Sequence, residues 1–455
     1  MLRINKVRII VFLMCLMLIS LSVLSLHQNN VIRGVFLLLS VFLLICIRQS
    51  KRFLMNSRLY IVYLLYTAAA TFLNHGLSMR LATALLTGSI YLVLFWGCRA
   101  LAARYSKEEV LKSVFSFCFC FLLIGDSIVL FSGTRGIGVS SGIPDYLIGN
   151  KFTISYVHML FLALYYWHLS EYYWSSSEYG GVIKRKGVLA FAYTLFICVI
   201  TDCATGIAGC IALAFFYLLF KKMPSAARLF SNPYFYCLFM GIISVSVIHM
   251  DLFTRFKPVA FIIEHFFHRN LTLTGRSFAF AVAILAISQK PLYGHGINST
   301  YVSSVLGWGN AQNGLLKVLL DYGVIGLLLF FWIVTDAFRI VRPRTYRKMK
   351  KKSGKSIFQS LYEELFQGSR LMKEDELALT AFLYAMSVCG TVEVCFSGFF
   401  FLGLSLLRMV KRYEASYRFW TPDELQPVLM QLMQVPHASY RYWTGDYEED
   451  EWNDE

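Results

Sequence analysis

The sequence predicts an all-α protein, a polytopic integral membrane bundle of about twelve transmembrane helices with one long extracytoplasmic loop. Three observations carry this prediction. First, apolar residues make up 57% of the 455 residues and charged residues only 15%, and the mean hydropathy of +0.56 excludes an ordinary soluble domain. Second, the apolar residues gather in runs of near membrane length. Third, the basic residues gather between those runs.

The apolar runs define the expected helices in order. A bilayer core of about 30 Å requires roughly 20 apolar residues, or somewhat fewer when flanking side chains snorkel. The first run follows basic residues as a signal peptide would, but no small-residue cleavage site follows it, so we interpret it as a transmembrane helix. The twelve expected spans are 9–27, 31–47, 59–74, 81–101, 111–131, 152–169, 187–202, 204–220, 234–250, 314–338, 376–395 and 398–410.

The distribution of Lys and Arg orients these spans, because cytoplasmic loops of membrane proteins retain basic residues. With the N-terminus inside, 33 of the 43 Lys and Arg residues lie on the cytoplasmic side and 10 lie outside. The inverse arrangement would place the basic run 339–355 outside. We therefore predict a multi-pass protein with both termini in the cytoplasm, and we expect the run 339–355 to contact anionic membrane lipids.

This orientation divides the chain into four predicted parts. Residues 1–250 form an N-terminal transmembrane bundle of about nine helices, 251–313 an extracytoplasmic loop, 314–410 the C-terminal transmembrane helices, and 411–455 a cytoplasmic tail. No ATP is available outside the membrane. Chemistry in the outer loop would therefore need a substrate that carries its own activated bond.

Charge and cysteine content exclude several classes of function. The formal charge of +16 does not indicate nucleic-acid binding, because the basic residues lie in short clusters between apolar runs. The eleven cysteines are irregularly spaced and include no C-x-x-C, so neither a disulfide framework nor a zinc site is expected. The outer loop has five basic and two acidic residues, which favours an anionic ligand over a carboxylate-held magnesium ion.

Polar motifs concentrate in and just after the outer loop. Gly275-Arg276 opens the apolar segment 277–288, which at 12 residues is too short to span and is expected to be an interfacial or re-entrant helix. Arg276 then lies at a helix start, where backbone N–H groups favour an anion. A Pro291-x-x-Gly294-x-Gly296 turn follows the segment. Gln312-Asn313 precedes a long apolar helix that carries Gly323-x-x-Gly326.

The order of these motifs resembles the shared signature domain of bacterial O-antigen polymerases and O-antigen ligases. That domain has a Gly-Arg pair, a Pro-x-x-Gly-x-Gly turn, a His-Asn pair and a Gly-containing helix. The resemblance implies a glycosyltransferase of the bacterial plasma membrane that uses an undecaprenyl-pyrophosphate-linked oligosaccharide as donor, with no nucleotide sugar, cofactor or metal. It also implies a flippase and a chain-length regulator as partners.

Gln312 stands where the family carries histidine, and this departure favours a polymerase of surface polysaccharide (O-antigen, capsule or exopolysaccharide) over a ligase. O-antigen ligase-type glycan transfer remains one alternative. A polysaccharide flippase or transporter is another, and that class should carry its polar residues near the middle of the bundle. A non-catalytic membrane partner of an assembly complex is the third.

The residues that the resemblance makes catalytic candidates are Arg276, His295, Gln312 and Asn313. Arg276 is expected to hold the donor pyrophosphate, for which a guanidinium fork suits better than an ammonium, although a loop arginine can also anchor to lipid phosphates. A neutral Gln312 amide positions an acceptor hydroxyl but cannot take its proton at pH 7. His295 is therefore the candidate base, against the commoner structural role of a lone histidine.

Further substrate contacts are expected from Arg255 and Arg269 in the same loop. The Gly-rich outer segment between the fifth and sixth spans supplies two more candidates, Arg135 and Lys151. The glycines at 323 and 326 are interpreted as sites of close helix packing. The acidic residues in or beside the apolar spans are expected to face the bundle interior or the membrane edge; they are Asp126, Asp202, Asp321 and Glu393.

Overall fold

The structure, a computed structural model, describes residues 6–46 apart from 22, 23 and 25, residues 58–173 apart from 141, 142 and 148, and residues 180–249, 261, 276–307, 310–339 and 372–417. These residues form fifteen α-helices, so the all-α prediction is confirmed. The helices are α1 (Lys6–Leu16), α2 (Leu26–Cys46), α3 (Arg58–His75), α4 (Met79–Arg104), α5 (Lys107–Ser132), α6 (Lys151–Tyr173), α7 (Gly180–Ile200), α8 (Ala204–Lys222), α9 (Pro224–Phe230), α10 (Pro233–Ile248), α13 (Arg276–Gln289), α14 (Tyr301–Leu306), α15 (Gly314–Phe338), α18 (Glu374–Cys389) and α19 (Gly398–Tyr417).

Each of the twelve predicted apolar segments overlaps at least one of these helices. The prediction for the first segment, 9–27, is wrong at its end, because α1 stops at Leu16 and α2 begins at Leu26. Among the described residues, five helical stretches are long and apolar enough to cross a membrane alone, and the pair α9–α10, bent by 80°, counts as a sixth if it is one span. The others are shorter or less apolar. The prediction for the segment 376–395 is wrong at its end, because α18 stops at Cys389 and residues 390–397 form a turn.

Two short elements lie between α5 and α6. The 3₁₀ turn η2 (Gly133–Arg135) leads into a hairpin of β1 (Gly138–Ser140) and β2 (Ile143–Asp145). The strands are antiparallel, with Val139 opposite Pro144. An isolated bridge between Asp145 and Asn150 then leads the chain into α6.

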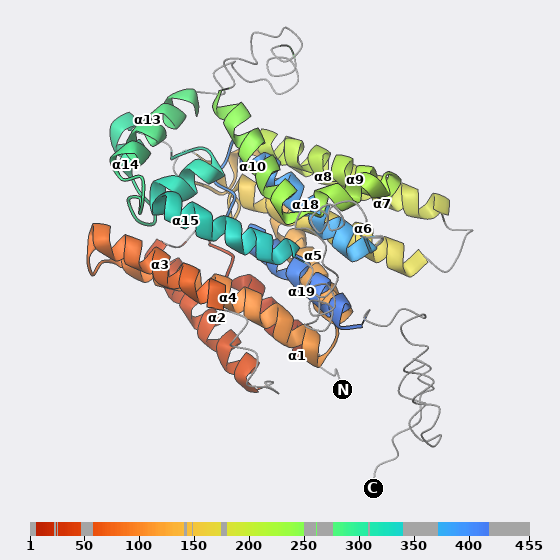
Figure 1. Cartoon of the computed structure of the whole chain (residues 1–455). Coiled ribbons are helices and arrows are strands. Elements are labelled where there is room, and N and C mark those ends of the chain that lie inside the picture. The colour runs from red at the N-terminus through yellow and green to blue at the C-terminus, as the bar shows by residue number, and fades with distance from the viewer. Residues whose placement is uncertain are drawn as a thin grey trace, which may run out of the picture.

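The helices pack around α18, of which fourteen of the sixteen residues are buried. This helix lies against α6 and α8, while α19 lies against α4, and α15 contacts α3, α10 and α13 (Figure 1). One apolar core therefore joins the N-terminal and C-terminal helices. Large apolar side chains also remain exposed on outward faces, including Leu38 of α2, Phe131 of α5 and Leu189 of α7, as lipid-facing helices require.

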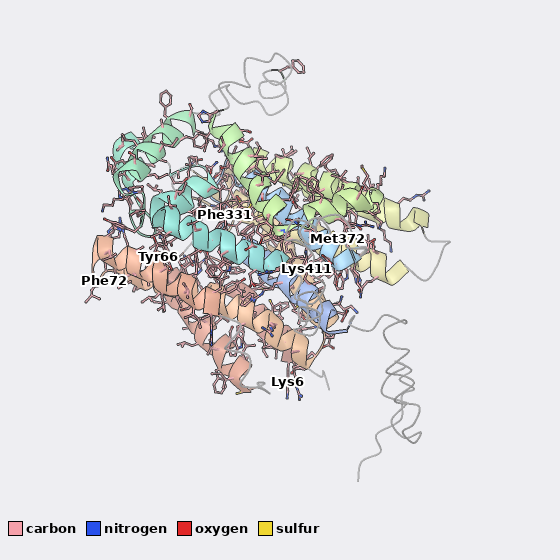
Figure 2. The ribbon with its side chains drawn as sticks, in the orientation of Figure 1. Lys6, Tyr66, Phe72, Phe331, Met372 and Lys411 are labelled. Carbon is pink, nitrogen blue, oxygen red and sulfur yellow. The ribbon has the colours of Figure 1, made fainter. Side chains whose placement is uncertain are left out.

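Three ion pairs lie at one end of the bundle. At the end that the sequence assigns to the cytoplasm, the first three residues of α18 each pair with a lysine of a different helix. These pairs are Glu374–Lys221 at 3.1 Å, Asp375–Lys107 at 2.6 Å and Glu376–Lys411 at 3.1 Å. Lys411 lies on the side of the bundle away from α13 and from Phe72 of α3 (Figure 2).

Residues 262–275 lie outside the described part, and the described helix α13 runs from Arg276 over 14 residues, about 21 Å, which is too short to span. The turn after it docks on a break in α15. There Gly323 has φ +64° and ψ −168°, and the backbone N–H of Val324 donates to the Pro291 carbonyl at 2.8 Å. A Cβ on Gly323 would overlap the carbonyl carbon of Leu292. The glycine expected to serve helix packing instead allows this docking.

Candidate functional site

Arg276 is the first described residue of α13 and makes two side-chain contacts. One terminal nitrogen, Nη2, donates to Oε1 of Glu393 at 2.7 Å, and Nε donates to Oε1 of Gln312 at 3.3 Å. The side chains of Arg276 and Glu393 are 20% and 10% exposed. We call these three residues the Arg276 cluster. Within the described residues, the other three N–H groups of this guanidinium donate to no protein acceptor, so they can meet a ligand.

The backbone brings Gln312 and Glu393 together by joining the start of α15 to the end of α18. Gln312 has a positive φ of 50°, which turns the chain just before the helix. The backbone N–H of Gly314 then donates to the Gly390 carbonyl at 2.7 Å. This bond joins backbone atoms at the ends of two helices. The backbone therefore holds the side chains of Gln312 and Glu393 in place.

Asn313 is fully buried and serves as the N-cap of α15. Its Oδ1 accepts from the backbone N–H groups of Leu315 and Leu316 at 3.0 and 3.1 Å and from the Ser244 hydroxyl at 2.9 Å. Its Nδ2 donates to the Thr391 carbonyl at 3.1 Å. The sequence makes Asn313 a catalytic candidate, but these contacts use its amide to fix the site, since a cap satisfies the open N–H groups of a helix start.

Lys151, at the first position of α6, is near enough to Glu393 for its charge to act on that carboxyl. Its ammonium donates to the Asp202 carbonyl oxygen at 2.8 Å and is 3.9 Å from the Asp202 carboxylate. Burial raises the pKa of the Glu393 carboxyl above its ordinary value, and the charges of Arg276 and Lys151 offset part of that rise. The site therefore holds a buried carboxylate whose negative charge is offset by two cations.

His295 lies at the opposite end of α13 from Arg276. Its Nε2 donates to the Ala286 carbonyl at 2.8 Å, and Ala286 is ten residues along α13 from Arg276, about 15 Å at 1.5 Å per residue. The backbone N–H of His295 donates to the Leu320 carbonyl at 2.8 Å. The structure therefore does not bring His295 to the Arg276 cluster, and the ring instead secures the turn after α13.

A second polar group surrounds that turn, and sequence reasoning missed it. Lys290 donates to Oδ1 of Asn74 at 2.6 Å, and Asn74 donates to the Gly294 carbonyl at 3.0 Å. The Nε2 of His75 donates to the His295 carbonyl at 2.9 Å. These residues attach the end of α3 to the outer segment, and their polar types at the end of an apolar run were the only signal available.

The remaining predicted binding residues lie apart from the cluster or outside the described part. Arg135 is exposed at the end of η2. Arg255 and Arg269 lie outside the described residues. Glu393 was expected only to face the bundle interior or the membrane edge, and its pairing with Arg276 was not foreseen. Among the described residues, no group of three His, Cys, Asp or Glu side chains is arranged to hold a metal ion.

A family model described as O-antigen ligase matches residues 189–331. No curated protein and no solved structure matches the chain. The matched range includes Arg276 and Gln312, whereas Lys151 precedes it and Glu393 follows it, so the fold adds these two charges to the domain from outside its limits. The resemblance predicted from the loop motifs is confirmed, because residues 189–331 are similar to the O-antigen ligase domain.

Proposed function

We propose that this protein is a membrane glycosyltransferase that polymerises oligosaccharide repeat units linked to undecaprenyl pyrophosphate, at the outer face of the bacterial plasma membrane. The O-antigen ligase domain supports a role in surface-glycan processing. The observation that carries the proposal is the Arg276 cluster, a guanidinium at the start of a short apolar helix within an apolar bundle. The donor suits this site, because its lipid lies in the membrane and its diphosphate lies at the membrane surface.

Arg276 would bind the donor diphosphate. Its three N–H groups that have no acceptor among the described residues form an anion site. Lys151 adds a second positive charge near Glu393. Arg135, Arg255 and Arg269 are proposed to add weaker contacts to the glycan or the diphosphate.

Gln312 favours the polymerase among the members of this family. Its amide oxygen already faces Arg276, so it suits the orientation of an acceptor hydroxyl beside the donor. The acceptor would be the terminal sugar of a second lipid-linked chain. In this proposal, 251–313 is the extracytoplasmic catalytic segment between the transmembrane parts 1–250 and 314–410, the tail 411–455 is cytoplasmic, and a flippase and a chain-length regulator act beside the protein.

One observation is relevant to the flippase alternative, namely a polar group inside the bundle. Asp126 of α5 accepts from His158 at 3.0 Å and from the Tyr193 hydroxyl at 2.8 Å. Both carboxylate oxygens are therefore already bonded by protein groups. A carboxylate that served a transported sugar would need an open position, so this group suits a structural role better.

The test is Arg276→Ala in the purified full-length protein, supplied with lipid-linked repeat units and excess chelator, because the proposal includes no metal ion. Polymer formation is expected to fall about 100-fold, or roughly 3 kcal/mol of transition-state stabilisation. Arg276→Lys should recover part of it, since an ammonium keeps the charge but lacks the fork.

Arg185→Ala, which removes an exposed arginine near the start of α7, is the matched control and should polymerise normally. A ladder of products that differ by one repeat unit indicates a polymerase, whereas transfer of one finished chain to a lipid acceptor indicates a ligase. Wild-type product in Arg276→Ala would refute the proposed site.

A further inference from the structure

The proposed transfer leaves one proton without a destination. When the acceptor hydroxyl attacks the anomeric carbon, its O–H bond must break. The Gln312 amide cannot accept that proton, and the Nε2 of His295 is bonded to the Ala286 carbonyl, about 15 Å along α13 from Arg276. A base must therefore come from another part of the chain.

Glu393 lies where such a base is needed. Its Oε1 accepts from Nη2 of Arg276 at 2.7 Å, and the Nε of the same guanidinium donates to Oε1 of Gln312 at 3.3 Å. Because both acceptors share one guanidinium, the carboxylate and the amide oxygen lie next to each other. A sugar hydroxyl oriented by Gln312 would therefore meet the Glu393 carboxylate.

We propose that Glu393 is the general base of the transfer and that Arg276 releases it when the donor binds. This rests on the proposed function. The carboxylate takes the proton of the acceptor hydroxyl, the hydroxyl oxygen forms the new bond to the anomeric carbon, and the bond from that carbon to the diphosphate oxygen breaks. Its electron pair leaves with undecaprenyl pyrophosphate, and the Glu393 carboxylic acid later returns its proton to water.

An exchange of ion-pair partners would activate the base. Before the donor binds, the Arg276 guanidinium neutralises Glu393 and makes it a poor base. A diphosphate carries more negative charge and more acceptor oxygens than one carboxylate, so it draws the guanidinium away. Glu393 is then left buried without its nearest counter-charge, which raises its affinity for a proton.

The surroundings of Glu393 define the expected pH dependence. Arg276 faces it from α13 and Lys151 from α6, and Tyr156, Cys389 and Cys395 are its neutral titratable neighbours. Burial raises the pKa of the carboxyl above its ordinary value, with the two cations opposing that rise. The carboxylate exists above this pKa, so kcat should fall as the pH drops through it. Loss of the Arg276 contact in the donor complex moves that fall to higher pH.

The decisive variants are Glu393→Gln and Glu393→Ala in the full-length protein in lipid nanodiscs. Glu393→Gln keeps the shape but not the base, so kcat should fall about 100- to 10,000-fold. The low-pH fall in kcat should disappear from what activity remains. Binding of undecaprenyl pyrophosphate, measured by thermal stabilisation, should persist because Arg276 is intact.

The rate of Glu393→Ala should rise at least about tenfold when formate is added, because formate returns a carboxylate to the vacated space. Glu374→Gln is the matched control, because it removes a carboxylate at the other end of α18, and it should show the wild-type pH profile and no response to formate.

Two results would overturn the proposal. One is a Glu393→Gln protein with wild-type kcat and the wild-type low-pH fall, because Glu393 would then only position Arg276. The other is a Glu393→Ala protein that binds undecaprenyl pyrophosphate but gains nothing from formate. If Arg276→Ala is inactive in the same assay, either result removes the base and leaves the proposed function standing. Wild-type polymer in Arg276→Ala would instead remove the proposed function.

Discussion

Replacing Asn313 by alanine is expected to destabilise the protein rather than to block a chemical step. Loss of an N-cap costs about 1 kcal/mol. The Ser244 hydroxyl and the Thr391 carbonyl also lose their bonds to the amide, at about 1 kcal/mol for each buried group left unpaired. The total is about 3 kcal/mol, which is a large part of the stability of an ordinary domain.

The assay is thermal unfolding of the purified protein together with polymer formed per amount of folded protein. Asn313→Ser should recover the capping share, because a serine hydroxyl also accepts from the first N–H groups of a helix. Asn310→Ala is the control from the same segment; its side chain is exposed and accepts from the Gln312 N–H at 2.8 Å, so it should cost less. A fully stable but inactive Asn313→Ala protein would refute this reasoning and return Asn313 to the catalytic residues.

Three more outcomes are expected. Gly323→Ala should prevent docking of the 291–296 turn and lower the melting temperature, because φ is +64° and a Cβ has no space. The control Gly241→Ala should be tolerated, because a Cβ there has nothing within 4 Å. Equal melting temperatures for the two variants would contradict the break in α15. Glu376→Gln should lower the free energy of unfolding by about 3–5 kcal/mol, since the side chain of its partner Lys411 is 0% exposed. Glu374→Gln should lower it by less than about 1 kcal/mol, because its partner Lys221 is 45% exposed. Similar losses in thermal or chemical unfolding would contradict this ranking. In a cysteine-free background, Ser304→Cys should react with an impermeant reagent in intact cells and Lys222→Cys should not, and the reverse pattern would invert the predicted topology.

The parts of the site that are local in sequence could be predicted. The Gly-Arg pair and the apolar length of 277–288 predicted a short helix beside Arg276, and the described part of α13 runs from Arg276 to Gln289. Asn313 before a long apolar run marked the start of α15. These features depend only on a few neighbouring residues and on helix geometry, so they can be predicted from the local sequence.

The partner of Arg276 could not be predicted in the same way. Glu393 lies 117 positions away, and its segment 391–400 reads as a continuation of an apolar span, so hydropathy gave no sign that α18 ends at Cys389. The role of His295 was also hidden, because only the folded turn shows its Nε2 bonded to Ala286. Both facts depend on packing between distant segments, which local patterns do not record.

The position of α18 explains how the site can respond to a donor without a large movement. At one end, Asp375 and Glu376 form buried ion pairs with lysines of two other helices. At the other end, the Gly390 carbonyl binds the start of α15, and Glu393 follows three residues later. Glu393 and Gln312 are therefore held on rigid supports, whereas Arg276 is attached to them only through its side chain. On the proposed mechanism, rotation of that one side chain toward the diphosphate is enough to free the base, so a lid or domain closure is not required.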